Sequence, residues 1–106
     1  MSEKQGGAFA ALADPTRRGI LKLLRQGSRA AGDVASEFSL AKPTISHHLR
    51  LLEEAGLVRS ERRGTSIVYT LQANVLEELA AELLDLTAGL RAGDAAHGER
   101  RRKRTT

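Results

Sequence analysis

The chain has 106 residues, of which 41 % are hydrophobic, so it is long enough for one small domain with a modest core. It contains no cysteine, which excludes disulfides, thiolate metal sites and thiol redox sensing. No apolar run is long enough to span a bilayer, and residues 1–7 are polar and carry no apolar signal segment, so the sequence predicts a cytoplasmic protein without a membrane partner.

The net charge of +4 is unevenly distributed along the chain. Residues 1–73 carry eleven basic and seven acidic side chains, residues 74–90 carry four acids and no base, and residues 91–106 carry six bases and two acids. Basic regions beside an acidic one favour a polyanionic partner that is bound by one face of the protein. Ordinary solvated surface charge explains the same distribution equally well, so the charge alone does not establish a polyanionic partner.

Helical spacing and capping signals predict four helices in the first half of the chain. Asp14 is a good N-cap and Pro15 suits the first helical position, while Gly27 and Gly56 end helices. Ser39 to Ala41 is expected to form a tight turn. The expected helices span residues 6–13, 15–26, 31–38 and 42–55, and their predicted core side chains are Ile20, Leu21, Leu23, Leu24, Val34, Ala35, Phe38, Ile45, Leu49 and Leu52.

The second half begins with a change to strand-forming residues. Residues 57–61 and 66–71 predict two strands, joined at a tip of Arg62, Arg63, Gly64 and Thr65. Asn74, with Glu77 three residues later, resembles a capping box at the start of the last helix. We expect a flexible N-terminus over residues 1–7, one domain over residues 8–90 and a disordered basic tail over residues 91–106. A leucine stripe on the last helix consists of Leu76, Leu79, Leu83, Leu86 and Leu90.

The predicted fold is mainly α with a small β-hairpin (α+β), in the order ααααββα. A short helix, a tight turn and a longer helix, followed by a basic hairpin, form the plan of a winged helix-turn-helix. A helix that enters the major groove of DNA needs one apolar face to seat it and one polar face to contact the bases. On a helical wheel, Ile45, Leu49 and Leu52 fall together, and the polar side chains fall on the other side.

The sequence therefore predicts contacts with double-stranded DNA from three segments. An amphipathic helix or an arginine-rich hairpin is, by itself, more often an ordinary surface feature, but the two in this order favour DNA binding. The wing tip suits phosphates or a narrow minor groove, where arginine is favoured. His48 lies nearer the core face, and we expect it to be structural. The predicted DNA-binding residues are Lys42, Pro43, Thr44, Ser46, His47 and Arg50 in the helix, Arg62, Arg63 and Gly64 in the wing, and Arg17 and Arg18 as phosphate contacts.

Three segments resemble the ArsR-type (arsenic-repressor-like) winged-helix regulators. Residues 9–21 are similar to the opening of that family, with the run Asp14-Pro15-Thr16-Arg17-Arg18. Residues 42–58 resemble its recognition helix and the exit from it, and residues 64–71 resemble its wing. The resemblance implies a homodimer that is held by the first and last helices, binds an inverted repeat and represses transcription.

The leucine stripe supports such a dimer independently, although covering the domain itself would also explain it. The predicted dimer interface consists of Phe9, Leu12, Leu76, Leu79, Leu83 and Leu86.

The sequence departs from the metal-sensing branches of the family. Ala30 and Gly32 stand where arsenic-sensing members carry a Cys-x-Cys motif, and the last helix has no histidine. The side chains of His47 and His48 point about 100° apart on a helix, so they cannot both bind the same metal ion. We therefore predict no metal site and no cofactor.

The sequence also bears on other classes of function. No catalytic constellation or phosphate loop is present, so we predict that the protein is not an enzyme. A winged helix can also serve as a protein-interaction module, because a fold does not fix a function. The sequence leaves open a partner protein or a small-molecule effector.

Overall fold

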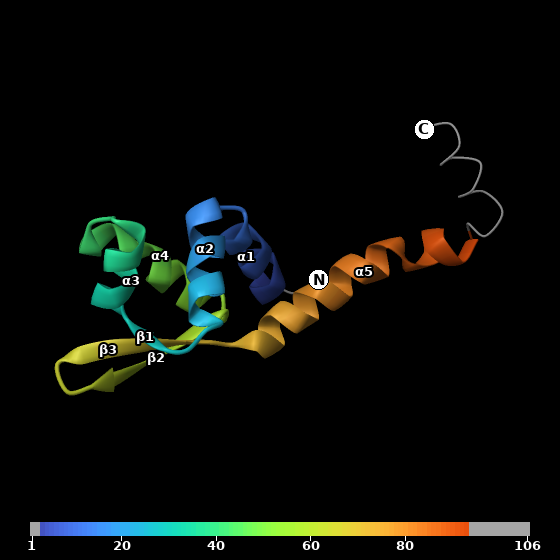
Figure 1. Ribbon diagram of the computed structural model, residues 1–106. Helices are drawn as coiled ribbons and strands as arrows, with labels where there is room; N and C mark the ends of the chain where they lie inside the picture. Colours follow the sequence, from blue (N-terminus) through green and yellow to red (C-terminus); the bar gives the residue numbers. More distant parts are fainter. Residues whose placement is uncertain (1–2, 94–106) are drawn as a thin grey trace. The chain divides into compact units, whose positions relative to one another are not determined.

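The computed structural model describes the backbone of residues 3–93 and the side chains of residues 6–90. Within this range the chain forms two compact units, one up to Leu76 and one from Glu77 onward. The first unit contains four helices and three strands, and the second contains most of the last helix (Figure 1). The elements are α1 (Glu3–Leu12), α2 (Pro15–Leu24), β1 (Arg29–Ala30), α3 (Ala31–Phe38), α4 (Lys42–Glu54), β2 (Val58–Arg63), β3 (Ser66–Leu71) and α5 (Ala73–Gly93).

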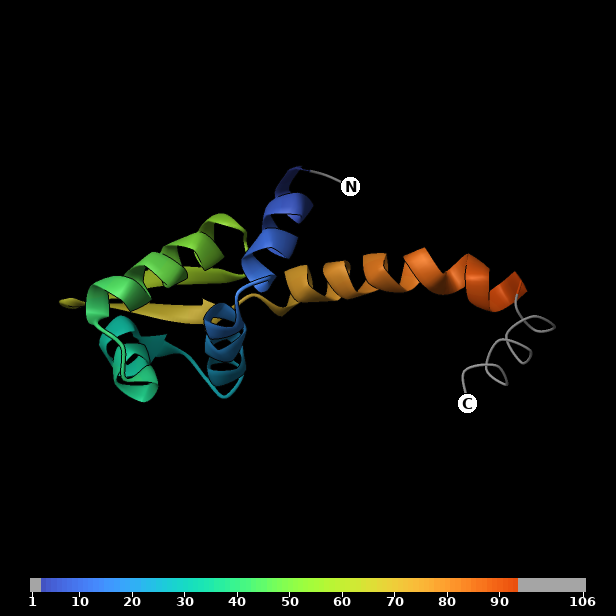
Figure 2. The ribbon, with the colours of Figure 1, turned by 90° about the horizontal axis from the view of Figure 1, so that it is seen from above.

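The strands form one antiparallel sheet in the order β1-β3-β2. Helices α2, α3 and α4 lie over one side of this sheet (Figure 1). Seen from above, α4 runs beside β2, whereas α3 lies near β1 and β3 (Figure 2). The helix-turn-helix pair α3–α4 is therefore supported from below by the wing strands, which is the architecture predicted from the sequence.

The core consists of aliphatic side chains from the helices and from the start of β2. Ile45, Leu49 and Leu52 are fully buried on one face of α4, as predicted. Burying such side chains stabilises a fold by about 1.5–3 kcal/mol each. Gly19 allows α2 and α3 to approach closely, because a methyl group in place of its hydrogen would lie 2.9 Å from Cε1 of Phe38. Ser39 ends α3 in the left-handed conformation, with φ of 53°, and so forms the tight turn.

Several boundaries differ from the prediction. Helix α1 begins at Glu3, so residues 3–7 are helical, because Glu3, Lys4 and Gln5 are good helix formers. Helix α2 ends at Leu24 and α4 at Glu54, each slightly before the predicted end. Helix α5 begins at Ala73, so Asn74 lies inside it and the predicted capping box is wrong. Residues 91–93 still belong to α5, and the expected basic tail from residue 94 lies outside the described residues.

The hairpin is also tighter than predicted. Strand β2 continues to Arg63, which pairs with Ser66, and Arg62 pairs with Ile67. The predicted four-residue tip is therefore wrong, because the two arginines belong to the ladder and Gly64-Thr65 alone forms the turn. Gly64 has φ of 62°, a conformation that residues with a Cβ rarely adopt. Strand β1 was not predicted and pairs with Tyr69 and Val68 of β3.

Candidate DNA interface

Helix α4 separates an apolar face from a polar face. Ile45 and Leu49 are fully buried against the core. Pro43, His47 and Arg50 fall on the opposite side of the helix and are exposed, as are Thr44 and Ser46. Exposed polar side chains on a helix that is fixed to the core by its other face have the arrangement that base contacts require.

His47 and Arg50 form a pair on this polar face. The distance from Nη2 of Arg50 to Nδ1 of His47 is 3.0 Å. A guanidinium can only donate, so Nδ1 of His47 accepts and its proton lies on Nε2. The pair therefore presents an imidazole N–H and a guanidinium side by side, both of which can donate to acceptors on a base edge.

One flank of α4 faces the helices α1 and α2. Nη1 of Arg17 lies 3.4 Å from Nδ1 of His48, and Nε of Arg17 donates to the carbonyl oxygen of Ala11 at 2.8 Å. Nη1 of Arg18 donates to the carbonyl oxygen of Leu12 at 2.7 Å. The last carbonyls of a helix lack partners within the helix, so both arginines complete the end of α1. Their contact with DNA phosphates stays a prediction, and both now have a structural role. His48 is half-buried and contacts Arg17, and its predicted structural role stays a prediction.

Asp14 fixes the start of α2 beside these arginines. Its Oδ2 accepts a hydrogen bond from the backbone N–H of Arg17 at 2.9 Å, with extended backbone at Asp14 itself. This bond, together with the nearby Arg17 and His48 side chains, holds the pKa of the Asp14 carboxyl below its ordinary value. The N-cap predicted from the sequence is therefore present and orients Arg17.

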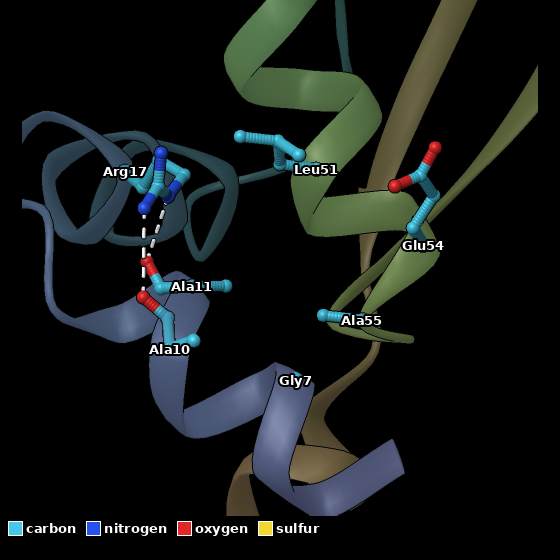
Figure 3. Close-up of a pocket in the computed structure, with 7 residues that line it drawn as sticks. All are labelled: Gly7, Ala10, Ala11, Arg17, Leu51, Glu54 and Ala55. Atoms are coloured by element: carbon cyan, nitrogen blue, oxygen red, sulfur yellow. Dashed lines mark hydrogen bonds between the residues drawn. The ribbon is translucent and has the colours of Figure 1, made fainter. Parts of the chain in front are cut away.

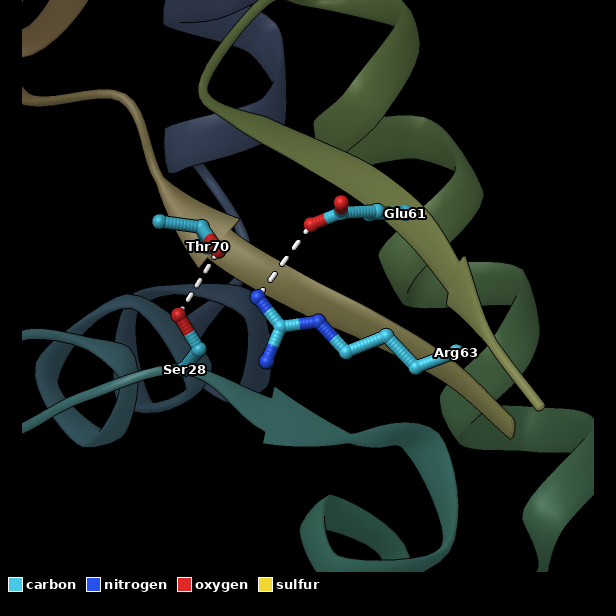
Figure 4. A network of polar contacts seen from close by, with 4 residues as sticks. All are labelled: Ser28, Glu61, Arg63 and Thr70. Carbon is cyan, nitrogen blue, oxygen red and sulfur yellow. Dashed lines mark hydrogen bonds and ion pairs between the residues drawn. The ribbon is translucent and has the colours of Figure 1, made fainter.

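The two wing arginines point to opposite faces of the hairpin. Residues that pair directly across two strands share a face, so Arg62 lies on the face of Ile67. Arg63 alternates to the other face, where its Nη2 lies 3.3 Å from Oε1 of Glu61 (Figure 4). Ser28, the residue before β1, and Thr70 of β3 form a hydrogen bond between their hydroxyls at 2.7 Å (Figure 4). Nothing in the sequence indicated that the two arginines lie on different faces, because both were predicted to belong to the turn.

A polar contact joins the wing to α4. The hydroxyl of Ser60 donates to Oε2 of Glu53 at 2.6 Å. Burial, and then the negative charge of Glu53, raise the pKa of Tyr69, which pairs with Ser60 across the sheet. The wing is therefore attached to the last turns of α4, and its tip extends beside the first turns.

Two clefts open in the first unit. One, of about 290 Å³, lies between α1 and α4 and is lined by Gly7, Ala10, Ala11, Arg17, Leu51, Glu54 and Ala55 (Figure 3). The other, of about 230 Å³, lies between the start of α4 and the wing. Lys42 and Ser46 line this second cleft together with four residues that were not among the predicted site residues, namely Thr65, Ser66, Ile67 and Tyr69.

The predicted dimer residues differ in exposure. Phe9, Leu12 and Leu76 are half-buried, and Leu79 is 1 % exposed. Leu83 and Leu86 are 53 % and 72 % exposed, and so are free to meet another surface. The stripe thus divides into a buried beginning and an exposed continuation.

No cluster of three or more potential metal ligands occurs in residues 6–90. Among the helices that the structure describes, none has the length and apolar character needed to cross a membrane.

Fold and site together define a winged helix-turn-helix protein. A family model described as "Bacterial regulatory protein, arsR family" matches residues 14–60. The transcriptional repressor SdpR of Bacillus subtilis is 47 % identical over 70 residues, which cover 66 % of this chain and 78 % of that protein.

Solved structures agree with this relationship. An ArsR-like transcriptional regulator from Rhodococcus sp. RHA1 has a TM-score of 0.76 and 31 % identity, and the match covers 88 % of each chain. A homodimeric winged helix-turn-helix DNA-binding domain from Mycobacterium bovis has a TM-score of 0.68 and 28 % identity, with 91 % of this chain and 84 % of that chain covered. The chain belongs to the ArsR family of transcriptional regulators. The prediction of a DNA-binding regulator rather than an enzyme is confirmed by these relatives.

Proposed function

We propose that this protein is a transcriptional repressor that binds an inverted-repeat operator as a homodimer. The observation that carries the proposal is the polar face of α4, on which His47 and Arg50 lie opposite the fully buried Ile45 and Leu49. A helix held in this way can enter the major groove with its donors toward the bases. The similar SdpR is named a transcriptional repressor, which supports the direction of the effect.

The contacts with DNA divide into two kinds. His47 and Arg50 contact base edges, and Pro43 and Thr44 approach the same groove from the first turn of α4. Arg62 and Gly64 of the wing, with Arg17 and Arg18 of α2, contact phosphates or the adjacent minor groove, whereas Arg63 lies on the other face of the hairpin and pairs with Glu61. Phosphate contacts set the affinity and base contacts set the sequence preference.

The dimer is formed by α1 and α5. Exposed Leu83 and Leu86 on α5 provide apolar surface that a monomer would leave in water. Phe9 and Leu12 of α1 supply further half-buried apolar side chains. A homodimer has two recognition helices related by a two-fold axis, and such a pair matches an inverted repeat. The homodimeric solved relative supports this assembly.

Repression by this protein does not depend on a metal ion. The whole chain has no cysteine, and Ala30 and Gly32 have no side-chain donor at the positions where the resemblance to arsenic sensors would place ligands. Adding Zn(II) or arsenite to the purified protein should leave its affinity for DNA unchanged. A loss of operator binding on adding either one would contradict this part of the proposal.

The test uses duplexes selected from random DNA by the purified protein. Arg50→Ala and His47→Ala should each reduce the preference for the selected duplex over a scrambled one by about 1–3 kcal/mol per lost base contact. Lys22→Ala is the matched control, since Lys22 is exposed on α2 outside the proposed interface. If neither α4 variant changes the preference, base recognition by α4 is refuted. If the wild-type protein selects no duplex at all, the proposal that this protein binds DNA without a partner protein is refuted.

A further inference from the structure

The cleft between α4 and the wing combines side chains from segments that are distant in the sequence. Its volume is about 230 Å³. It opens where α3 and α4 begin and where β3 leaves the hairpin turn. The lining residues are Ala30, Ala31, Gly32, Lys42, Ser46, Thr65, Ser66, Ile67 and Tyr69.

The lining favours an anion. Lys42 is its one cation, and none of the nine lining residues is an acid. Ser46, Thr65 and Ser66 add three hydroxyls, and these side chains, like Lys42, are exposed. An ammonium and several hydroxyl donors around one space suit a group with several acceptor oxygens, which is the character of a phosphate.

The apolar part of the lining suits the neighbour of such a phosphate. Ile67 is 40 % exposed although it is large and apolar, and the ring of Tyr69 lies beside it on the same face of β3. The phenol of Tyr69 is protonated at neutral pH, as any tyrosine is, and can donate a hydrogen bond. The deoxyribose next to a backbone phosphate could pack against Ile67 and the ring of Tyr69.

The geometry of duplex DNA explains why the cleft lies at this point. A helix in the major groove and a wing at the adjacent minor groove lie on the two sides of one sugar–phosphate strand, because that strand separates the grooves. The strand must therefore pass between α4 and the wing. The cleft is the space between these two elements, beside the first turns of α4 that enter the groove.

One acid on this side of α4 is already engaged. Glu53 lies further along the same flank of α4 and accepts the hydroxyl proton of Ser60 at 2.6 Å. Among the arginines that the sequence predicted to contact DNA, Arg17, Arg18 and Arg63 bond to protein oxygens. Lys42 lines the cleft itself, so it can supply the positive charge that a phosphate there needs, whereas these three arginines are engaged elsewhere.

We propose that the cleft is a phosphate site, occupied in the complex by one backbone phosphate of the DNA strand that passes between α4 and the wing. This inference rests on the proposed function. It assigns Thr65, Ser66 and Tyr69 to the interface and makes Lys42 and Ser46 phosphate-binding rather than base-contacting residues.

The experiment measures the coupling between Lys42 and individual phosphates of a selected duplex. Each backbone position near the contacted groove is replaced in turn by an uncharged methylphosphonate, and the dissociation constants of wild type and Lys42→Gln are measured. Neutralising one position should weaken the wild-type protein and leave Lys42→Gln almost unaffected, because the partner of that phosphate is already gone. Lys42→Gln should also lower the salt slope by about 0.9 on any duplex.

The hydroxyls are tested with the double variant Thr65→Val/Ser66→Ala, whose two sites are exposed. It should bind the duplex about tenfold more weakly, and the same methylphosphonate should lose its effect. Ser36→Ala, an exposed serine of α3 outside the cleft, is the control and should behave as wild type.

The outcomes separate this proposal from the proposed function. If wild type binds the duplex and no methylphosphonate position is coupled to Lys42, the phosphate site is refuted while DNA binding stands. If wild type binds no duplex, the proposed function fails first. A third arm titrates inorganic phosphate into the DNA-free protein and follows the amide signals of Ser46 and Ser66. Saturable binding there, without coupling to any backbone position, would identify a free anion as the occupant and overturn the DNA strand as its source.

Discussion

Removing the two wing arginines separately should affect DNA binding unequally. Arg62 shares the face of Ile67, which lines the cleft beside α4, whereas Arg63 lies on the other face, 3.3 Å from Glu61. If Arg62 neutralises one phosphate, Arg62→Ala should lower the salt slope by about 0.9. Over a fourfold range of salt, from about 50 to about 200 mM, the contribution of one such contact changes by about 3.5-fold. The loss of affinity should therefore be about 3.5 times larger at the lower salt concentration.

The matched comparison removes the ion pair on the other face. Glu61→Gln/Arg63→Ala leaves the net charge of the wing unchanged, and both side chains are about two-thirds exposed, so the pair itself contributes little to stability. We expect this variant to keep the salt slope of wild type. Fluorescence anisotropy with a labelled duplex at several salt concentrations measures both variants. A loss of slope in Glu61→Gln/Arg63→Ala as large as in Arg62→Ala would refute the assignment of faces.

The remaining predictions concern the core, the helix start and the dimer. Leu49→Ala removes a fully buried side chain and should lower the free energy of unfolding by about 2–5 kcal/mol in urea titrations, whereas the exposed Leu84→Ala should change it by less than about 0.5 kcal/mol; equal effects would contradict the assigned core. The pKa of Asp14 is lowered in the folded protein, so its stabilising contribution is present above its ordinary value of 3.8 and is lost as the pH falls through the lower folded value. Asp14→Asn can still cap α2 but should lack this part of the acid dependence, and an unchanged dependence would exclude the carboxylate as its source. Leu83→Glu should convert the dimer to a monomer in sedimentation measurements while Glu78→Gln leaves it intact, and a monomer with wild-type affinity for the full operator would contradict the proposed interface.

The sequence was informative where local signals agreed with the packing. Helix α3 has the predicted bounds, and the buried face of α4 is the predicted stripe of Ile45, Leu49 and Leu52. Asp14 caps α2 as its position before Pro15 suggested. In each case the residues that define the element lie within a few positions of one another.

The sequence was less informative where the partner lies far along the chain. Strand β1 has two residues, too few for an alternating pattern, and exists because β3 supplies partners about forty positions later. Gly64 located the hairpin turn, but the pair Arg63–Ser66 set its length. The hydrogen bonds of Arg17 and Arg18 depend on where the end of α1 lies. The cleft required the starts of two helices to meet the wing, so Thr65 and Ser66 carried no signal by themselves.

Recognition of an operator by a metal-free homodimer can be tested directly on genomic DNA. Genomic fragments should be selected with the purified, metal-free protein at physiological salt and then footprinted. A homodimer with two recognition helices should protect an inverted repeat with half-sites about one helical turn apart. No enrichment over bulk DNA, or protection of a single unpaired half-site, would contradict dimeric recognition without a metal ion.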